Sequence, residues 1–111
     1  MALYVCTTDP KINPSATVAV LRRYAIVRDW EINTVVLDAS PLDTPLTARE
    51  QWAEIQDMIE ERRAEGVIAL HGHICDPAPG DRGPLLRWLT ERGGFLSVVP
   101  YGKRGGFDVH L

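Results

Sequence analysis

One stretch decides the fold of this chain: EGVIALHGHICDPAPGD, residues 65–81. The four apolar residues from Val67 to Leu70 lie between Gly66 and Gly72, a pattern typical of a short strand that is buried on both faces. The loop that follows contains two histidines, a cysteine and two aspartates. In open α/β sheets, ligands and catalytic groups lie just beyond the carboxyl ends of such strands, so we expect any functional site at this end of the sheet.

Three further runs of apolar and β-favouring residues predict three more strands, at residues 2–7, 31–38 and 95–99. Connections of ten or more residues separate the strands, which implies parallel strands, right-handed crossovers and helices on both faces. The predicted fold class is therefore α/β, with three layers and a mostly parallel sheet of four or five strands. The fifth would be a short edge strand at residues 107–111. No repeat or low-complexity linker interrupts residues 1–111, which predicts a single domain.

Helical spacing of apolar residues predicts three helices, at about residues 15–29, 47–64 and 84–92. Ser15 is the expected N-cap of the first. The sequence Thr47-Ala48-Arg49-Glu50 has the pattern of a capping box at the start of the second, and Gly66 is its expected C-terminal cap. Asp81 is the expected cap of the third, with Pro84 in its first turn. The residues expected to face the sheet are Val18, Leu21, Tyr24, Ala25, Val27, Trp52, Ile55, Met58, Ile59, Leu85, Leu86, Leu89 and, in part, Trp88.

The composition limits the functions to consider. Of 111 residues, 45% are hydrophobic and 24% are charged, as in an ordinary soluble globular protein. The net charge of -3 argues against a domain that holds nucleic acid by charge alone. No apolar run approaches the ~20 residues that span a bilayer, and no signal-peptide pattern begins the chain, so we expect a cytoplasmic protein without a membrane partner. Two cysteines are too few for a disulfide framework, and we expect buried, inert thiols.

Four short motifs follow one another along residues 2–99. They are Tyr4-Val5-Cys6-Thr7-Thr8-Asp9, Asp38-Ala39-Ser40, Arg49-Glu50-Gln51-Trp52 and, after the third strand, Asp76 with Asp81-Arg82. In order and spacing they resemble the N-terminal domain of the serine recombinases (the resolvase/invertase family), whose motifs read Tyr-x-Arg-Val-Ser-Thr, Asp-x-x-Ser-Gly, Arg-Pro-x-Trp and Asp-Arg-Leu-x-Arg. The resemblance implies a resolvase-like α/β fold, a homodimer, and DNA or a DNA-binding protein as a partner.

Departures from the family pattern argue against its reaction. The family attacks a DNA phosphate with a serine hydroxyl, while several arginines neutralise the phosphoryl oxygens. Here the serine position holds Thr8, the neighbouring arginine position holds Cys6, and at most one arginine of the last motif remains, as Arg82. Residues 1–111 also contain no counterpart of the family's dimerising helix or helix-turn-helix domain. We therefore expect a catalytically degenerate domain that acts as a small regulatory or protein-interaction module.

Two alternatives remain open. One is a small enzyme or anion-binding protein on a flavodoxin-like scaffold, using the pocket at the carboxyl ends of the first and third strands. Its catalytic residues would be Thr8, Arg49, Asp76 and Arg82, and its ligand-binding residues Asp38, Ser40, His71 and His73. In a competing interpretation, Arg49 simply lies exposed in the first turn of a helix. The second alternative is a DNA-associated accessory protein.

The loop after Leu70 also contains residues of the types that bind metals. His71, His73 and Cys75 alternate, so in an extended segment their side chains would share one face. No distant pair of histidines or cysteines completes a tetrahedral site, however, and no glycine-rich nucleotide-binding motif follows any strand. We therefore expect neither a metal nor a cofactor.

Overall fold

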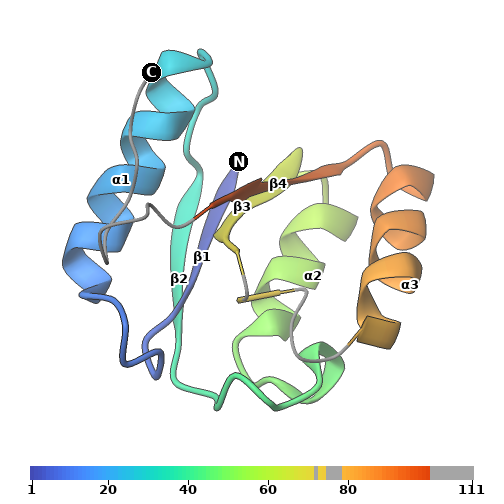
Figure 1. Cartoon of the computed structure of the whole chain (residues 1–111). Helices are drawn as coiled ribbons and strands as arrows, with labels where there is room; N and C mark the ends of the chain where they lie inside the picture. The colour runs from blue at the N-terminus through green and yellow to red at the C-terminus, as the bar shows by residue number, and fades with distance from the viewer. Residues whose placement is uncertain (72, 75–78, 101–111) are drawn as a thin grey trace.

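The computed structural model describes residues 1–71, 73–74 and 79–100 (Figure 1). Strands and helices alternate along the chain, as the sequence predicts. The elements are β1 (Ala2–Cys6), α1 (Pro14–Val27), β2 (Thr34–Asp38), the 3-10 turn η1 (Leu46–Ala48), α2 (Trp52–Glu60), β3 (Gly66–Leu70), α3 (Pro79–Glu91) and β4 (Phe95–Val99). In the described part of the chain, no helix is long and apolar enough to cross a membrane. The predicted fifth strand at residues 107–111 lies outside the described residues.

The four strands form one parallel sheet in the order β2-β1-β3-β4. Tyr4 in β1 is in register with Val36 of β2 and Ala69 of β3. Both central strands are buried along their whole length. The predicted parallel sheet is confirmed, and so is the prediction that the stretch after Gly66 forms a strand buried on both faces.

Helices cover both faces of the sheet, which confirms the three-layer prediction (Figure 1). On one face, Leu21 and Ala25 of α1 pack with Leu3, Val5 and Ile68. On the other face, α2 and α3 pack over the alternate residues of the same strands. This alternation follows from the two-residue period of strand side chains.

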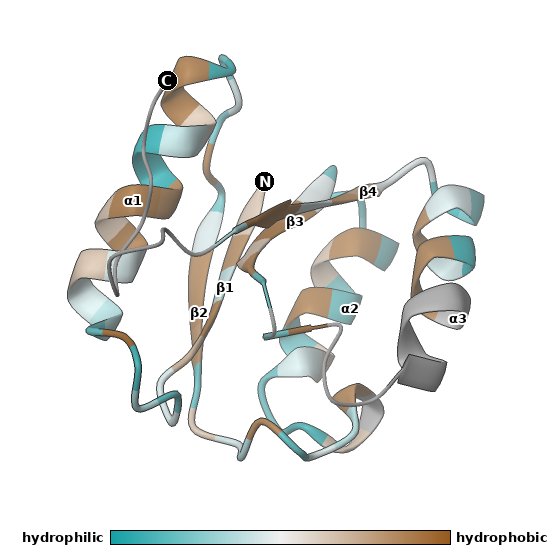
Figure 2. Cartoon of the chain, viewed as in Figure 1, coloured by the Kyte–Doolittle hydropathy of each residue, from teal (hydrophilic) through white to brown (hydrophobic). Residues whose placement is uncertain are grey.

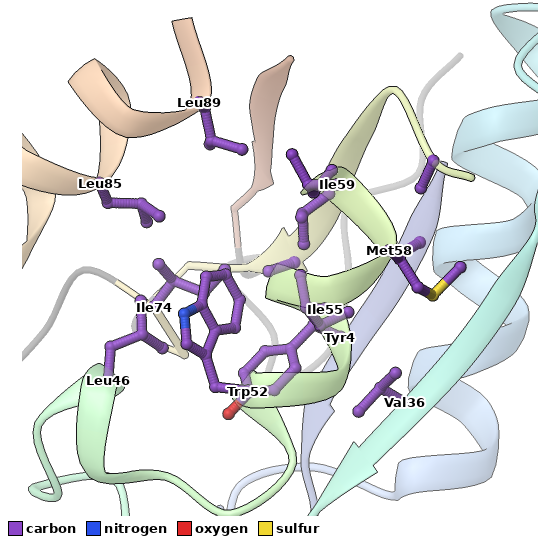
Figure 3. Close-up of a cluster of buried hydrophobic side chains, with 14 of the residues drawn as sticks. Tyr4, Val36, Leu46, Trp52, Ile55, Met58, Ile59, Ile74, Leu85 and Leu89 are labelled. Carbon is purple, nitrogen blue, oxygen red and sulfur yellow. The ribbon is translucent and has the colours of Figure 1, made fainter. Parts of the chain in front are cut away.

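The larger core cluster is built around Trp52 (Figure 3). The ring of Tyr4 meets the ring of Trp52 edge to face, with centroids 5.4 Å apart. Leu85 and Leu89 reach the cluster from α3. Each fully buried side chain of this size contributes roughly 1.5–3 kcal/mol through the hydrophobic effect. All four core residues predicted for the second helix are buried in this cluster.

The helix starts differ from the sequence predictions. The N-cap of α1 is Asn13, not Ser15, because the Asn13 side chain accepts a hydrogen bond from the Ala16 amide at 3.1 Å. The second helix begins at Trp52, so the capping box at residues 47–50 does not form. Instead Leu46–Ala48 makes a 3-10 turn, and the backbone of Arg49 is extended (ψ 132). This extended residue interrupts the predicted helix.

The third helix begins at Pro79 rather than Pro84, so Asp81 lies within the helix and not at its N-cap position. Two residues predicted to face the sheet are exposed. Val27 is 54% exposed and Leu86 is 40% exposed. A helix advances about 100° per residue, so Leu86 cannot share the face that its buried neighbour Leu85 occupies. For the same reason Val27 lies off the face that carries Leu21 and Ala25.

All three helices end in the same backbone motif. The residue after the last turn adopts a left-handed conformation: Asp29 after α1 (φ 58), Arg62 after α2 (φ 58) and Gly93 after α3 (φ 72). In each case the next amide bonds back to a carbonyl in the last turn, as in a Schellman motif. Gly66 is therefore not the cap of α2. It begins β3, where an added Cβ atom would lie 2.3 Å from the carbonyl oxygen of Phe95.

Candidate functional site

A cluster of buried polar side chains lies at the carboxyl ends of β1, β2 and β3. We define the carboxyl-end cluster as Tyr4, Cys6, Asp9, Asp38, Arg49 and His73. Apart from Thr17, every buried polar or charged residue in the described part of the chain belongs to it. The location agrees with the sequence prediction, since the cluster includes residues directly beyond the buried strand β3.

Arg49 joins the loops that follow two strands. Its guanidinium donates to the carbonyl oxygens of Leu42 and Thr44, both at 3.0 Å, and to that of His73. Its Nη1 atom also lies 3.4 Å from the Tyr4 hydroxyl and 3.5 Å from the Cys6 sulfur. The residue is 3% exposed, so the interpretation as an exposed first-turn arginine is wrong. The guanidinium points into the protein, and its N–H groups donate to protein atoms.

Asp38 contributes a buried carboxylate to the carboxyl-end cluster. It is fully buried at the end of β2, where its carboxylate accepts hydrogen bonds from the Tyr4 hydroxyl at 2.7 Å and the Ser40 amide at 2.8 Å. Burial alone would raise the pKa of Asp38, but these hydrogen bonds and the nearby Arg49 charge hold that pKa below its usual value. Burial and the bond to Asp38 raise the pKa of Tyr4 far above its usual value. Asp38 is therefore ionised and internally paired.

His73 links the ends of β1 and β3. Its Nδ1 atom accepts a hydrogen bond from the Cys6 amide at 3.1 Å, which leaves the ring proton on Nε2. The Nε2 atom lies 3.0 Å from Asp9 Oδ2 and donates to it. Burial lowers the pKa of His73, and the neighbouring Asp9 offsets only part of this effect. His73 is thus a neutral, fully enclosed ring with both nitrogens engaged, rather than a free metal or substrate ligand.

Cys6 occupies the position that corresponds to an arginine in the resemblance. Its thiol is buried and contacts the carbonyl oxygen of His73 at 3.7 Å. Burial raises the pKa of Cys6, so the sulfur stays protonated. This agrees with the expected inert thiol. Cys75 lies outside the described residues.

The remaining predicted site residues lie at or near the surface. Thr8 is exposed, and its hydroxyl donates to the carbonyl oxygen of the half-buried Ser40 at 2.9 Å. His71 is exposed, and its backbone amide bonds to the carbonyl oxygen of Val99. Asp76 and the side chain of Arg82 lie outside the described part. The structure thus joins Asp38, Arg49 and His73 in one network and pairs Thr8 with Ser40 instead.

Asp9 contributes a buried carboxylate to the site that no motif of the sequence predicts. Asp9 precedes Pro10 at the end of the first strand, which is the pattern of an ordinary turn. Tyr4 was part of a motif but was given no role. Within residues 1–71, 73–74 and 79–100, no three histidine, cysteine or acidic side chains are grouped to hold a metal ion.

Comparison with known proteins supports the fold that the motifs indicate. The structure is similar to the crystal structure of the C-terminal catalytic domain of ISC1926 TnpA, an IS607-like serine recombinase. The TM-score is 0.70, the match covers 93% of this chain and 72% of that one, and 14% of the aligned residues are identical. No family model matches the sequence, and no curated protein does. The chain therefore has the resolvase-like α/β fold of a serine-recombinase catalytic domain, with four parallel strands and three α-helices in its described part.

Proposed function

We propose that this chain is a catalytically inactive serine-recombinase-like domain that acts as a small regulatory or protein-interaction module. The observation that carries the proposal is the burial of Arg49, which is 3% exposed and bonded to three loop carbonyls. Phosphoryl transfer needs cations that face the reacting phosphate, because negative charge builds on its oxygens. A guanidinium that is fully engaged inside the protein cannot supply that stabilisation.

The other groups of the carboxyl-end cluster point the same way. Cys6 holds a buried, protonated thiol in place of a phosphate-binding arginine. Thr8 keeps a hydroxyl, but its hydrogen is donated to the Ser40 carbonyl rather than to a base. A nucleophilic hydroxyl requires a base within hydrogen-bond reach, and the only imidazole of the cluster, His73, is enclosed between Cys6 and Asp9. In this proposal, the polar residues of the cluster stabilise the fold.

A DNA-cleavage assay tests the absence of chemistry. The full chain is incubated with supercoiled plasmid and quenched with detergent, and nicked DNA and covalent protein–DNA adducts are measured. We expect the wild type to match Thr8→Ala, its matched control, in both measurements. We also expect Thr8→Ser to stay inactive, because restoring the smaller nucleophile leaves Arg49 buried. Adducts that form with the wild type and disappear in Thr8→Ala would overturn the proposal.

A further inference from the structure

A second polar region lies at the opposite end of the sheet, at the amino ends of the strands. Here a hollow of about 330 Å³ opens between the ends of α1 and α2. The residues that line it are Met1, Asp29, Trp30, Glu31, Asn33, Arg62, Arg63 and Glu65. The terminal ammonium of Met1 is already held there by the Glu31 carbonyl and the Asn33 side chain. Burial lowers the pKa of this ammonium, and the nearby Glu65 and Glu31 carboxylates offset part of that effect, so these two carboxylates face a cation of the protein itself.

Two charged side chains of the hollow, Asp29 and Arg62, have no ion-pair partner among the described residues. Arg63 pairs with Glu61 at 2.9 Å. Among the described residues, by contrast, Arg62 forms no ion pair or side-chain hydrogen bond, and the same holds for Asp29. Charges of both signs thus face one hollow unpaired, whereas every buried side-chain nitrogen and oxygen in the described part of the chain has a hydrogen-bond partner.

Two residues of the hollow, Asp29 and Arg62, also have a left-handed backbone conformation. Asp29 and Arg62 both have φ 58 at the end of a helix, a conformation that favours glycine. The equivalent position after α3 is a glycine, Gly93, and it does not line the hollow. A residue other than glycine carries a steric cost in this conformation, and such residues cluster at functional sites. Here both such side chains, of opposite charge, face the hollow.

Apolar and aromatic residues adjoin the hollow on the α1 side. Trp30 lines it and packs against Phe95, with ring centroids 5.2 Å apart. Ile26 is 68% exposed and Phe95 is 38% exposed. Figure 1 shows the last turn of α1 standing clear of α2 and α3, and Figure 2 shows hydrophobic residues on this turn. Exposed apolar side chains around a tryptophan, with arginine nearby, are the composition of binding hot spots.

We propose that the amino-end face, formed by residues 26–31 with Arg62, Glu65 and Phe95, binds the same face of a second copy of this chain. The inference rests on the proposed interaction module and names its partner. A partner of a single charge would be repelled by part of the face, whereas an identical face carries both charges. Around a two-fold axis, Arg62 meets the partner's Asp29, and the reverse pair forms by symmetry. The apolar side chains next to these pairs supply the burial that exposed ion pairs lack.

Sedimentation velocity over a range of protein concentrations tests this interface. We expect a monomer–dimer equilibrium whose Kd rises with salt, because salt screens ion pairs. Arg62→Asp places two acidic residues opposite each other and should weaken the dimer about tenfold or more, as should Asp29→Arg. The double variant Asp29→Arg/Arg62→Asp restores both pairs and should recover most of the affinity. Arg22→Asp, an equal change of charge at an exposed site of α1 outside the face, is the matched control and should have no effect.

Thermal unfolding of each variant separates a lost interface from a lost fold. Aspartate tolerates the left-handed conformation better than arginine, so Arg62→Asp should fold as well as the wild type. A monomer at all concentrations, or a double variant that stays as weak as the single ones, would overturn the proposed interface. A monomer that also forms no DNA adduct would refute this interface alone. An adduct that depends on Thr8 would refute the proposed inactivity and leave a measured dimer standing.

Discussion

The two ends of the sheet use charge in opposite ways. At the carboxyl ends, Asp38, Arg49 and His73 are buried and hydrogen-bonded to protein atoms. At the amino ends, Asp29 and Arg62 face a hollow without partners among the described residues. The fold family leads one to expect chemistry at the first end, yet the charges there hold loops together. A charged group indicates a possible binding site when it has no partner within the protein, whatever its location in the fold.

Replacing Arg49 is the strongest test of the buried end. Arg49→Met should lower the free energy of unfolding by about 3–5 kcal/mol, because it leaves three loop carbonyls without their donor and removes the positive charge near the buried Asp38. Arg49→Lys should lose less, since an ammonium can keep some of the carbonyl contacts. Urea unfolding followed by circular dichroism gives both values. Arg22→Met, at an exposed site on α1, should stay within about 0.5 kcal/mol of the wild type. Equal losses at Arg49 and Arg22 would contradict the conclusion that Arg49 holds the two loops together.

Removing the Tyr4 hydroxyl tests the pairing of Asp38. Tyr4→Phe keeps the ring that packs on Trp52 but removes the donor 2.7 Å from the Asp38 carboxylate. We expect a loss of about 1–3 kcal/mol in the free energy of unfolding, the cost of a buried charged acceptor left short of a partner. Tyr24→Phe is the control, because its hydroxyl meets Ser97 at 2.9 Å in a partly buried site and should cost about 1 kcal/mol or less. A larger loss for Tyr24→Phe than for Tyr4→Phe would contradict the pairing of Tyr4 with the buried Asp38 carboxylate.

His73 predicts how stability depends on pH. Its folded-state pKa lies below the ordinary value of 6.5, so the unfolded chain takes up the proton first as the pH falls. The stability from the neutral ring is therefore fully present above pH 6.5. It is lost between pH 6.5 and the lower folded-state pKa, by at most about 1.4 kcal/mol per pH unit.

Chemical unfolding at neutral pH and at about pH 5 measures this slope. His73→Gln should abolish it in this window, because the pKa of Asp38 lies below 3.8 and contributes only in stronger acid. His71→Gln removes an exposed histidine and should retain the slope of the wild type. If His71→Gln abolished the pH dependence and His73→Gln retained it, the enclosed, neutral state of His73 would be contradicted.

Substitutions at the amino ends of the strands should change the free energy of unfolding least, and one of them should raise it. Arg62→Gly should raise the free energy of unfolding by about 0.5–1 kcal/mol, because glycine adopts φ 58 without steric cost. Gly93→Ala should lower it by a similar amount, since nothing but the backbone conformation opposes a Cβ atom there. Differential scanning calorimetry resolves both changes. If the amino-end face is an interface, Arg62→Gly should also weaken the dimer, so that stability and association move in opposite directions.

The local patterns of the sequence predicted the sheet well and the helix ends poorly. The strand at residues 67–70 is predicted correctly because a short apolar run between glycines is typical of a buried strand. The capping box predicted at residues 47–50 is wrong because Arg49 leaves the helical conformation and reaches carbonyls in its own loop and in the loop after β3. Gly66 was assigned to a helix end, whereas its role is the close approach of the Phe95 carbonyl. Both of these errors involve a contact with a distant segment, His73 for Arg49 and Phe95 for Gly66.

The candidate site shows the same division. The motifs selected Arg49 and Asp38 correctly as residues of one region, because both lie beyond strands whose carboxyl ends meet at one edge. They did not reveal that Asp9 and His73, 64 residues apart, bond to each other. Thr8 was grouped with Arg49 by motif order, yet its hydroxyl bonds to Ser40. Residue types can be read from a sequence, but hydrogen-bond partners depend on which loops fold against one another.

By itself, the sequence determined the α/β class, the order of the elements and their three layers. These follow from the period of apolar residues and from connection length, which are local properties of the chain. Only the tertiary structure decided whether a charge is engaged or available. That outcome depends on desolvation and on neighbours brought together by the fold, which enclose Arg49 at one end of the sheet and leave Arg62 without a partner among the described residues at the other.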